Sequence, residues 1–432
     1  MVIGSRPGFL LVAALFGAGT AAAQKPRLTL EEAIARANRV QPSVISAGGS
    51  VRNAQARQRS ASGAFLPNLT LSGSRGDNFS QGSLIDPGTG QLTTSATQSV
   101  GATLSSNVDL FAGFRRTGEK RAASANRDAA EASFQNAQFQ QQLTTTNTFF
   151  DVLAAEQLMR VREASVRRAE EQLKVAVAKL QAGRGIRPDS LRSLVTLGNA
   201  QLQLVNAQTA LATAEANLGR LVGEDGPVGA ADDSTHYRLM PTVDTGALRA
   251  EALANAPAVK SAEASAASAH AGITIAKAAY YPTLNLSGSA SYNGSSRNDY
   301  KLLQSRSLTF GVNWPIFNRF QREQSIVSSQ VTAEVADASA AESRRQVLAS
   351  LIAAVAALDA ARLRIGISQT SVQAGQEDLR VQQERYRLGA ATIVDVLTSQ
   401  EALNQAEVDA VTARFDYVRA RAQIAALIGR TL

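Results

Sequence analysis

The chain of 432 residues consists of two halves that repeat each other in register. Residues 65–74 (FLPNLTLSGS) recur as residues 280–289 (YYPTLNLSGS), 215 positions later. Further along, Gly183 corresponds to Gly389, 206 positions later. Because the offset changes once, by nine residues, the halves differ by one loop and are otherwise collinear. Whatever the first half forms, the second half is expected to form again.

Each half is predicted to contain a helix, a β-hairpin, a very long helix and a return helix. These elements are expected at 28–64, 67–110, 112–182 and 188–222, and again at 247–279, 282–316, 318–388 and 393–428. The hairpin segments alternate apolar with polar residues, as strands with two unlike faces do. The long helical segments contain no proline, and their apolar residues recur every three or four positions.

This order predicts a domain plan. It has a signal peptide at 1–23, a first repeat at 24–222, a linker at 223–246 that lies at mid-height, and a second repeat at 247–430. We expect helix 188–222 to continue end to end into 247–279, and helix 393–428 to stack below 28–64. The result is a rod of four helical columns, about 105 Å long at 1.5 Å per residue. The Gly-, Asp- and Ser-rich segment 76–95 is interpreted as a loop on the exterior.

The N-terminal segment predicts export. Arg6 precedes an apolar run at residues 9–16, and Ala21–Ala23 offer a cleavage site. No later stretch approaches the ~20 consecutive apolar residues of a membrane-spanning helix. If the mature chain crosses a membrane, it must therefore do so as strands. Export also excludes the nucleic-acid partner that a formal charge of +8 would otherwise suggest.

Composition argues against an enzyme, a cofactor and a metal site. The chain has no cysteine, and its two histidines, His236 and His270, are far apart. This removes thiol chemistry, disulfides and the common zinc ligand sets. Gly183-x-Gly185 lacks the third glycine of a dinucleotide loop and follows a helix. No arrangement of Ser, His and Asp suggests a nucleophile, so we predict no catalytic residues.

Four strands per chain cannot close a barrel. An open strand edge in lipid leaves backbone groups unpaired at a cost of several kcal/mol each. Three copies supply twelve strands, within the range of transmembrane barrels. This predicts a homotrimer in contact with outer-membrane lipid. Two alternatives fit the same patterns: a soluble β-sandwich on a coiled coil for the strands, and an extended coiled-coil stalk rather than a tube for the helices.

The chain resembles the TolC-type outer-membrane efflux protein family. The resemblance covers residues 27–430 and is carried by the paired 65–74 and 280–289 segments, by Leu110-Phe111-Ala112-Gly113 and Pro315-Ile316-Phe317-Asn318, and by Tyr386-Arg387-Leu388-Gly389 with residues 393–397. It implies a trimeric 12-stranded β-barrel continuous with a periplasmic α-helical barrel. It further implies docking on a periplasmic adaptor and an inner-membrane pump.

The resemblance also implies a gate at the periplasmic end. Asp395 corresponds to the first aspartate of the family's constriction ring, whereas its second position is Thr398 here. Tyr386 and Asp189 match residues that link neighbouring helix pairs. The basic linking residue of the family falls at Ala391 and is absent. We hypothesise that Arg187 or Arg387 replaces it.

The same tip has a family-independent interpretation. Both chain reversals lie at one end of the rod, and Asp189 and Asp395 occupy equivalent places in the repeat. Three copies of Asp395 around an axis would favour cations. Alternatively, each aspartate stabilises the start of its helix through the dipole. A docking surface for the adaptor, or a merely solvated surface, is predicted at the turns and their arginines: Gly183, Arg184, Arg187, Arg387 and Gly389.

We therefore predict an α+β membrane protein that conducts substrates passively out of the cell. It would be the exit duct of a tripartite efflux or type I secretion system in the outer membrane of a Gram-negative-type bacterium. The alternative is a trimeric coiled-coil structural or adhesive surface protein without a pore; a periplasmic enzyme on a helical scaffold lacks the polar cluster it would need. Drugs, metal ions, glycolipids and secreted proteins all stay open as cargo, as do the identities of adaptor and pump and the resting state of the tip.

Overall fold

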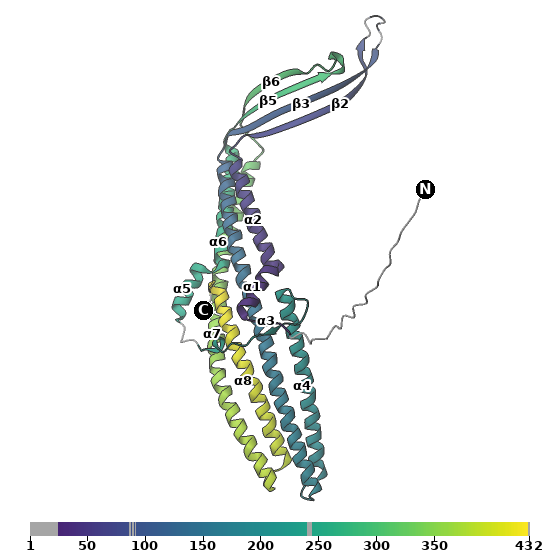
Figure 1. Ribbon diagram of the computed structural model, residues 1–432. Helices are drawn as coiled ribbons and strands as arrows, with labels where there is room; N and C mark the ends of the chain where they lie inside the picture. Colours follow the sequence, from purple (N-terminus) through teal and green to yellow (C-terminus); the bar gives the residue numbers. More distant parts are fainter. Residues whose placement is uncertain (1–24, 86–87, 89, 91, 240–243, 431–432) are drawn as a thin grey trace, which may run out of the picture.

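A computed structural model describes residues 25–85, 88, 90, 92–239 and 244–430. The predicted signal peptide, 1–23, lies outside the described residues. The molecule is long and narrow, with a curved four-stranded sheet at one end, a column of helices below it, and two helical hairpins at the far end (Figure 1). A smaller layer of short elements surrounds the helices at mid-height.

Two very long helices run through the helical column. Helix α3 (Arg115–Gln181) has 67 residues and α7 (Gln321–Leu388) has 68, so each extends about 100 Å at 1.5 Å per residue. Each begins after a residue in the left-handed conformation, Phe114 with φ of 70° and Phe320 with φ of 63°. These residues turn the chain from a strand into a helix.

The two strand-to-helix junctions are built alike. In the first half, the Arg116 guanidinium lies 4.8 Å above the Phe65 ring and donates to the carbonyls of Ala64 and Leu110. In the second half, Arg322 lies 4.7 Å from the centroid of the Tyr280 ring. It donates to the carbonyls of Pro315 and Ile316. One arginine at each junction thus satisfies carbonyls that the turn leaves without backbone partners.

The expected helices 28–64 and 247–279 are each divided in two. The first forms α1 (Leu30–Val40) and α2 (Pro42–Gly63), and the second forms α5 (Thr245–Asn255) and α6 (Pro257–Lys277). The break has the same cause in both. A proline disfavours helical backbone at the residue before it, and Gln41 and Ala256 accordingly have ψ of 126° and 121°.

The predicted end-to-end stacking was wrong. Helix α4 (Arg187–Val222) leads up to α1 and α2, where Gln41 Nε2 donates to the Leu221 carbonyl at 2.6 Å. Helix α8 (Ile393–Ile428) instead ends below α5 and α6, where Arg430 pairs with Glu251. Each return helix therefore stacks on the first helix of its own repeat. Matching helix lengths could not distinguish the two arrangements, because both make columns of equal height.

The sheet has strand order β2-β3-β5-β6, and every neighbouring pair is antiparallel. The strands are β2 (Asn68–Ile85), β3 (Leu92–Ala112), β5 (Thr283–Ser295) and β6 (Leu303–Asn313). The loop expected at 76–95 is largely strand, with a register shift between Ser80 and Leu84. Pairing with the opposite strand outweighs the weak strand propensity of this Gly- and Asp-rich segment.

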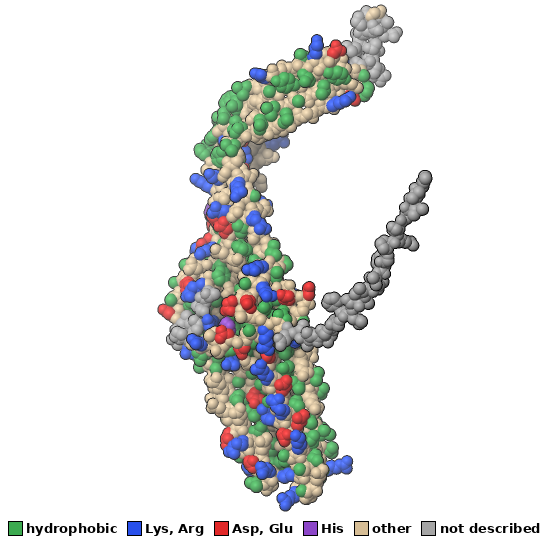
Figure 2. Space-filling model, viewed as in Figure 1, with side chains coloured by type: hydrophobic (Ala, Val, Ile, Leu, Met, Phe, Trp, Pro, Cys, Tyr) green, Lys and Arg blue, Asp and Glu red, His purple; other side chains and the backbone are tan. Residues whose placement is uncertain are grey.

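The two faces of the sheet differ in chemistry. Cross-strand partners share a face. One face carries exposed apolar side chains: Leu69, Leu71, Leu104, Leu308, Phe310 and Val312. Hydrophobic side chains are visible in green along the sheet in Figure 2. The other face carries hydroxyl and amide side chains: Thr70, Ser72, Thr103, Ser105, Asn107, Ser287, Ser289, Ser307 and Thr309. The alternation predicted from the sequence thus separates a mainly apolar face, which also carries Arg306 in the row of Leu71 and Leu104, from a polar face whose charged member is Asp109 next to the helices.

The mid-height layer contains the main hydrophobic core. Strands β1 (Arg27–Leu28) and β4 (Gly229–Ala230) pair in parallel, and the short helix η1 (Ser234–Tyr237) follows. The rings of Phe149, Phe150 and Phe415 are fully buried there. Burial and a 2.7 Å hydrogen bond from its hydroxyl to Asp232 raise the pKa of Tyr237. The layer ties α3, α4 and α8 together halfway along the molecule.

Helix α7 contains an 18-residue stretch that is long and apolar enough to cross a membrane, judged by length and composition. In this fold α7 packs along α6 and α8. Leu351 and Leu358 are buried in the mid-height core, at 3% and 5% exposure. Only 28% of the stretch is buried within this chain, so packing against α6 and α8 covers the smaller part of its apolar surface.

Candidate gate at the helical tip

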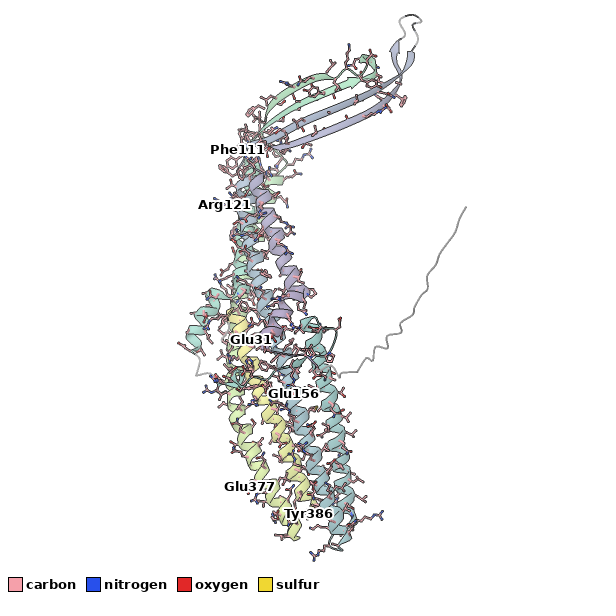
Figure 3. All side chains as sticks on the ribbon, viewed as in Figure 1. Glu31, Phe111, Arg121, Glu156, Glu377 and Tyr386 are labelled. Carbon is pink, nitrogen blue, oxygen red and sulfur yellow. The ribbon has the colours of Figure 1, made fainter. Side chains whose placement is uncertain are left out.

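The far end of the molecule consists of two hairpins, α3–α4 and α7–α8 (Figure 3). Gly183 and Gly389 lie in their turns with φ of +70° and +82°, a conformation that residues with a Cβ adopt only with strain. In the second turn, the amide of Gly389 donates to the Tyr386 carbonyl and that of Ala390 to the Arg385 carbonyl, which ends α7 sharply. The two glycines predicted for docking are therefore the residues that make both reversals tight.

Tyr386 is at the centre of the tip. Its side chain is 4% exposed and packs in a small cluster with Leu379, Ile393, Val396 and Leu403, against which Val175 of α3 also packs. Its hydroxyl oxygen is buried and has no hydrogen-bond partner among the described residues. Burial and the nearby Asp189 carboxylate raise the pKa of the Tyr386 phenol. The structure thus brings the Tyr386 hydroxyl and the Asp189 carboxylate near each other across the two hairpins.

Lys179, near the end of α3, also reaches Tyr386. Its ammonium nitrogen lies 3.9 Å from the centroid of the Tyr386 ring and donates to the Tyr386 carbonyl. Reasoning from the sequence missed this lysine, which lies 207 positions from its partner. One signal was present: Lys179 corresponds to Arg385 at the offset of 206. Arg385 donates to Ala390 within its own turn, so the two equivalent cations do different work.

The two arginines expected to replace the missing basic residue lie elsewhere. Arg387 is exposed and pairs with Glu384 on its own helix at 3.6 Å. Arg187 and Arg184 are exposed, and within the part of the chain that the structure describes their guanidinium groups make no hydrogen bond or ion pair. Among the described residues, no hydrogen bond or cation–π contact joins the side chain of Arg187 or Arg387 to Tyr386. The exposed cations at the tip are visible as blue side chains in Figure 2.

Asp395 lies in the first turn of α8, where it forms a capping box with the N-cap residue Thr392. Its Oδ2 accepts hydrogen bonds from the backbone N–H and the hydroxyl of Thr392, both at 2.8 Å. Thr392 Oγ1 accepts in return from the Asp395 N–H at 3.3 Å. The bonds from Thr392, together with the charge of Arg385, hold the Asp395 pKa below its ordinary value of 3.8. Asp395 therefore stabilises its helix and remains exposed and ionised at neutral pH.

Thr398 lies one turn beyond Asp395 on α8. Its side chain is exposed, and its hydroxyl donates to the Val394 carbonyl at 2.9 Å. It adds no charge to this surface.

An ion pair joins the hairpins above the tip. Arg168 of α3 donates to both carboxylate oxygens of Glu407 on α8, at 3.2 Å and 2.7 Å, and to Asn404 Oδ1 at 2.7 Å. The two charged side chains are 22% and 17% exposed. Such a two-pronged geometry fixes the relative position of the helices more firmly than a single contact.

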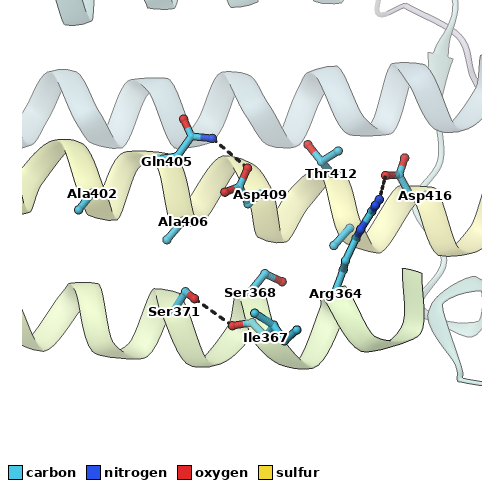
Figure 4. Close-up of a pocket in the computed structure, with 11 residues that line it drawn as sticks. Arg364, Ile367, Ser368, Ser371, Ala402, Gln405, Ala406, Asp409, Thr412 and Asp416 are labelled. Atoms are coloured by element: carbon cyan, nitrogen blue, oxygen red, sulfur yellow. Dashed lines mark hydrogen bonds and ion pairs between the residues drawn. The ribbon is translucent and has the colours of Figure 1, made fainter. Parts of the chain in front are cut away.

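A groove of about 610 Å³ runs between α7 and α8 (Figure 4). Small side chains, among them Ala402, Ala406 and Ser368, form its floor. Arg364 lies 4.0 Å from Asp416 at one end, and Gln405 donates to Asp409 at 2.9 Å toward the other. No group of three or more His, Cys, Asp and Glu is placed to hold a metal ion anywhere in the described ranges.

Comparison with known proteins decides what such a molecule is. The family model described as "Outer membrane efflux protein" matches residues 33–224 and 248–430. The chain belongs to the outer membrane efflux protein family. It is therefore an outer-membrane protein, and the two matched stretches fall on either side of the mid-height segment.

Individual relatives agree with this family. The chain is 26% identical over 428 residues to the outer membrane efflux protein BepC of Brucella suis, covering 96% of this chain and 91% of that one. It is 28% identical to the pyoverdine export outer membrane protein OpmQ of Pseudomonas aeruginosa, covering 86% and 78%. The crystal structure of the outer membrane protein VceC from Vibrio cholerae matches with a TM-score of 0.78 at 18% identity, covering 93% and 96%. The last likeness concerns the fold alone.

Proposed function

We propose that this outer membrane efflux protein is the exit duct of a tripartite efflux or type I secretion assembly, formed by three copies of the chain. The observation that supports it best is the sheet. Its outer strands, β2 and β6, have no partner on one side in the four-stranded sheet of this chain. One face is apolar and exposed, with Leu71 and Leu308 at 75% and 77%. Three such sheets joined edge to edge make a closed 12-stranded barrel with lipid outside and water inside.

The flanks of the helical column support the same assembly. Helix α4 exposes Leu194, Val195 and Leu202 along one side, and α7 exposes Leu363 and Ile367 along another. Apolar surface of this extent needs a cover. Neighbouring copies supply it when the columns of three chains close into a tube, which would extend the β-barrel into the periplasm. No observation favours a solid coiled-coil stalk.

The tip residues are proposed as the gate of this duct. Asp395 from three copies would form a ring that favours cations, with Thr398 behind it. Tyr386 and Asp189 would hold the hairpins together. Docking of a periplasmic adaptor, itself bound to an inner-membrane pump, is proposed at the exposed turns: Gly183, Arg184, Arg187, Arg387 and Gly389. Energy would come from that pump, and the duct itself would conduct passively.

The plan of the chain is proposed as two structural repeats, 24–222 and 247–430, joined by the mid-height linker 223–246 after removal of a signal peptide, 1–23. The similar junctions around Arg116 and Arg322 support this plan. The names of the relatives support export but no single cargo: one is named for pyoverdine and another for cobalt, zinc and cadmium resistance.

The test is planar-bilayer conductance of the detergent-extracted protein, with its oligomeric mass measured in the same preparation. We expect a trimer that gives discrete conductance steps. A water-soluble species without steps would reject the duct and favour the coiled-coil surface protein.

A further inference from the structure

We propose that Lys179 is the positioning cation of the gate, holding Tyr386 by its ring face and its backbone carbonyl and so keeping the two hairpins closed. This inference rests on the proposed function. It assigns the positioning role to a cation of α3, two residues before that helix ends. It also makes the link a contact within one chain.

The contacts of Tyr386 are the first argument. The side chain is almost fully buried, yet its hydroxyl makes no hydrogen bond with a described residue. The contacts that α3 makes with polar groups of Tyr386 are therefore to its ring face and its main-chain carbonyl, and Lys179 makes both. Asp189 approaches from the same hairpin on the side of the hydroxyl. Tyr386 is thus placed between a cation and an anion that belong to one hairpin, α3–α4.

The position along the molecule is the second argument. Arg168 joins α3 to α8 13 residues before the end of α3, about 20 Å above the tip at 1.5 Å per residue. Lys179 acts two residues before that end. A contact near the free end of two hairpins opposes their separation with more leverage than one near the point where they are joined. Lys179 is half-buried, which strengthens attraction between its charge and the ring relative to an exposed pair.

The experiment compares three substitutions at two lysines of one helix. Lys179→Met keeps a side chain of similar length and removes the charge, while Lys179→Arg keeps the charge. Lys174→Met is the matched control, because Lys174 is exposed on α3 and pairs only with Glu171 at 2.6 Å. In planar bilayers we expect Lys179→Met to raise the ratio of open to closed tip roughly tenfold, the effect of one partly desolvated cation–π contact. Lys179→Arg and Lys174→Met should behave as the parent protein does.

A second readout does not depend on conduction. Since the chain has no cysteine, spin labels at Gln181→Cys and Ala390→Cys report the separation of the two hairpin ends. We expect a longer and broader distance distribution in Lys179→Met alone. Adding Lys179→Met to Tyr386→Leu should lengthen the distance less than Lys179→Met does in the parent protein, because the ring is already absent and only the bond to the main-chain carbonyl at position 386 remains to be lost.

The outcomes separate the two proposals. If the parent protein gives no steps but the label distance lengthens in Lys179→Met, the duct is rejected and the Lys179 contact stands. If Lys179→Met matches Lys174→Met in label distance, the Lys179 contact is rejected, whatever the parent conducts. If Lys179→Arg opens the tip as far as Lys179→Met does, the charge is not what holds it, and the proposal is again rejected.

Discussion

Tyr386 and Asp395 both lie at the tip, and their surroundings give them different work. Asp395 is exposed and its Oδ2 is held by Thr392, whereas Tyr386 is buried with an unpartnered hydroxyl. A residue that lines a passage must keep its charge in water, and a residue that fastens two elements must be enclosed by them. The geometry therefore suits Asp395 to selectivity and Tyr386 to closure.

Replacing Asp395 with Asn should lower the cation preference of the channel while α8 keeps its start, because an amide oxygen still accepts from Thr392. Reversal potentials in a salt gradient measure the preference. Asp409→Asn, on the exposed side of the same helix, should leave it unchanged. Equal reversal potentials in Asp395→Asn and the parent protein would remove Asp395 from the constriction.

The pH dependence of that preference follows from the direction of the pKa shift. The Asp395 pKa is lowered from 3.8, so the carboxylate stays charged as pH falls until pH drops below that value. The capping contribution of Asp395 to stability is likewise present above the unfolded pKa and lost as pH falls through the folded one. We expect cation preference to be flat from pH 8 to about 5 and to decline only below about pH 4. A midpoint near pH 6 would contradict this assignment.

Tyr386→Phe and Tyr386→Leu separate the contribution of the hydroxyl to gate closure from that of the aromatic ring. Because the hydroxyl makes no hydrogen bond, Phe should leave single-channel conductance close to that of the parent protein. Leu removes the ring face that Lys179 contacts and should raise conductance clearly. A large increase with Phe would show that the hydroxyl, through Asp189, carries the closure.

At the scale of elements, local sequence patterns predict where helices and strands form. They do not predict which helices stack on one another. The alternation around Leu308, Phe310 and Val312 and the proline-free runs predicted the strands and long helices correctly. The stacking of α4 below α1 and α2 depends on contacts such as Gln41 with Leu221, 180 positions apart. Such contacts leave no periodic trace in the sequence. For Lys179, the correspondence with Arg385 marks a cation near both turns, but only the packing of the two hairpins shows that Lys179 contacts Tyr386.

The Arg168–Glu407 pair gives a prediction for how firmly the hairpins are joined. Arg168→Met leaves the Glu407 carboxylate without its partner in a mostly enclosed site. We expect a loss of about 2 kcal/mol in the free energy of unfolding, less than for a fully buried pair because both side chains retain some solvent contact. Arg345→Met removes an exposed pair with Glu342 and should cost well under 1 kcal/mol. Thermal unfolding of the extracted protein measures both, and equal midpoints would contradict the role of Arg168.

At the scale of the whole molecule, substitutions in the sheet test whether its apolar face contacts lipid. Leu71 and Ser72 are adjacent in β2 and face opposite sides. Leu71→Arg places a charge on the apolar face and should cost about 2–4 kcal/mol at the membrane centre, falling toward its edges. Ser72→Arg should be tolerated if that face meets water. Recovery of each variant in the outer-membrane fraction measures the difference, and equal recovery would mean that the apolar face does not meet lipid.

The exposed apolar flanks of α4 and α7 have a consequence for how the protein folds and assembles. In a single chain, both apolar flanks and both edges of the sheet stay uncovered. We therefore expect the isolated chain to have low stability. Folding and association should then be one equilibrium, governed by mass action. The midpoint of thermal unfolding should rise with protein concentration, and dilution alone should favour the unfolded chain. The number of assembled trimers would depend steeply on the amount of chain exported, because each trimer forms from three copies.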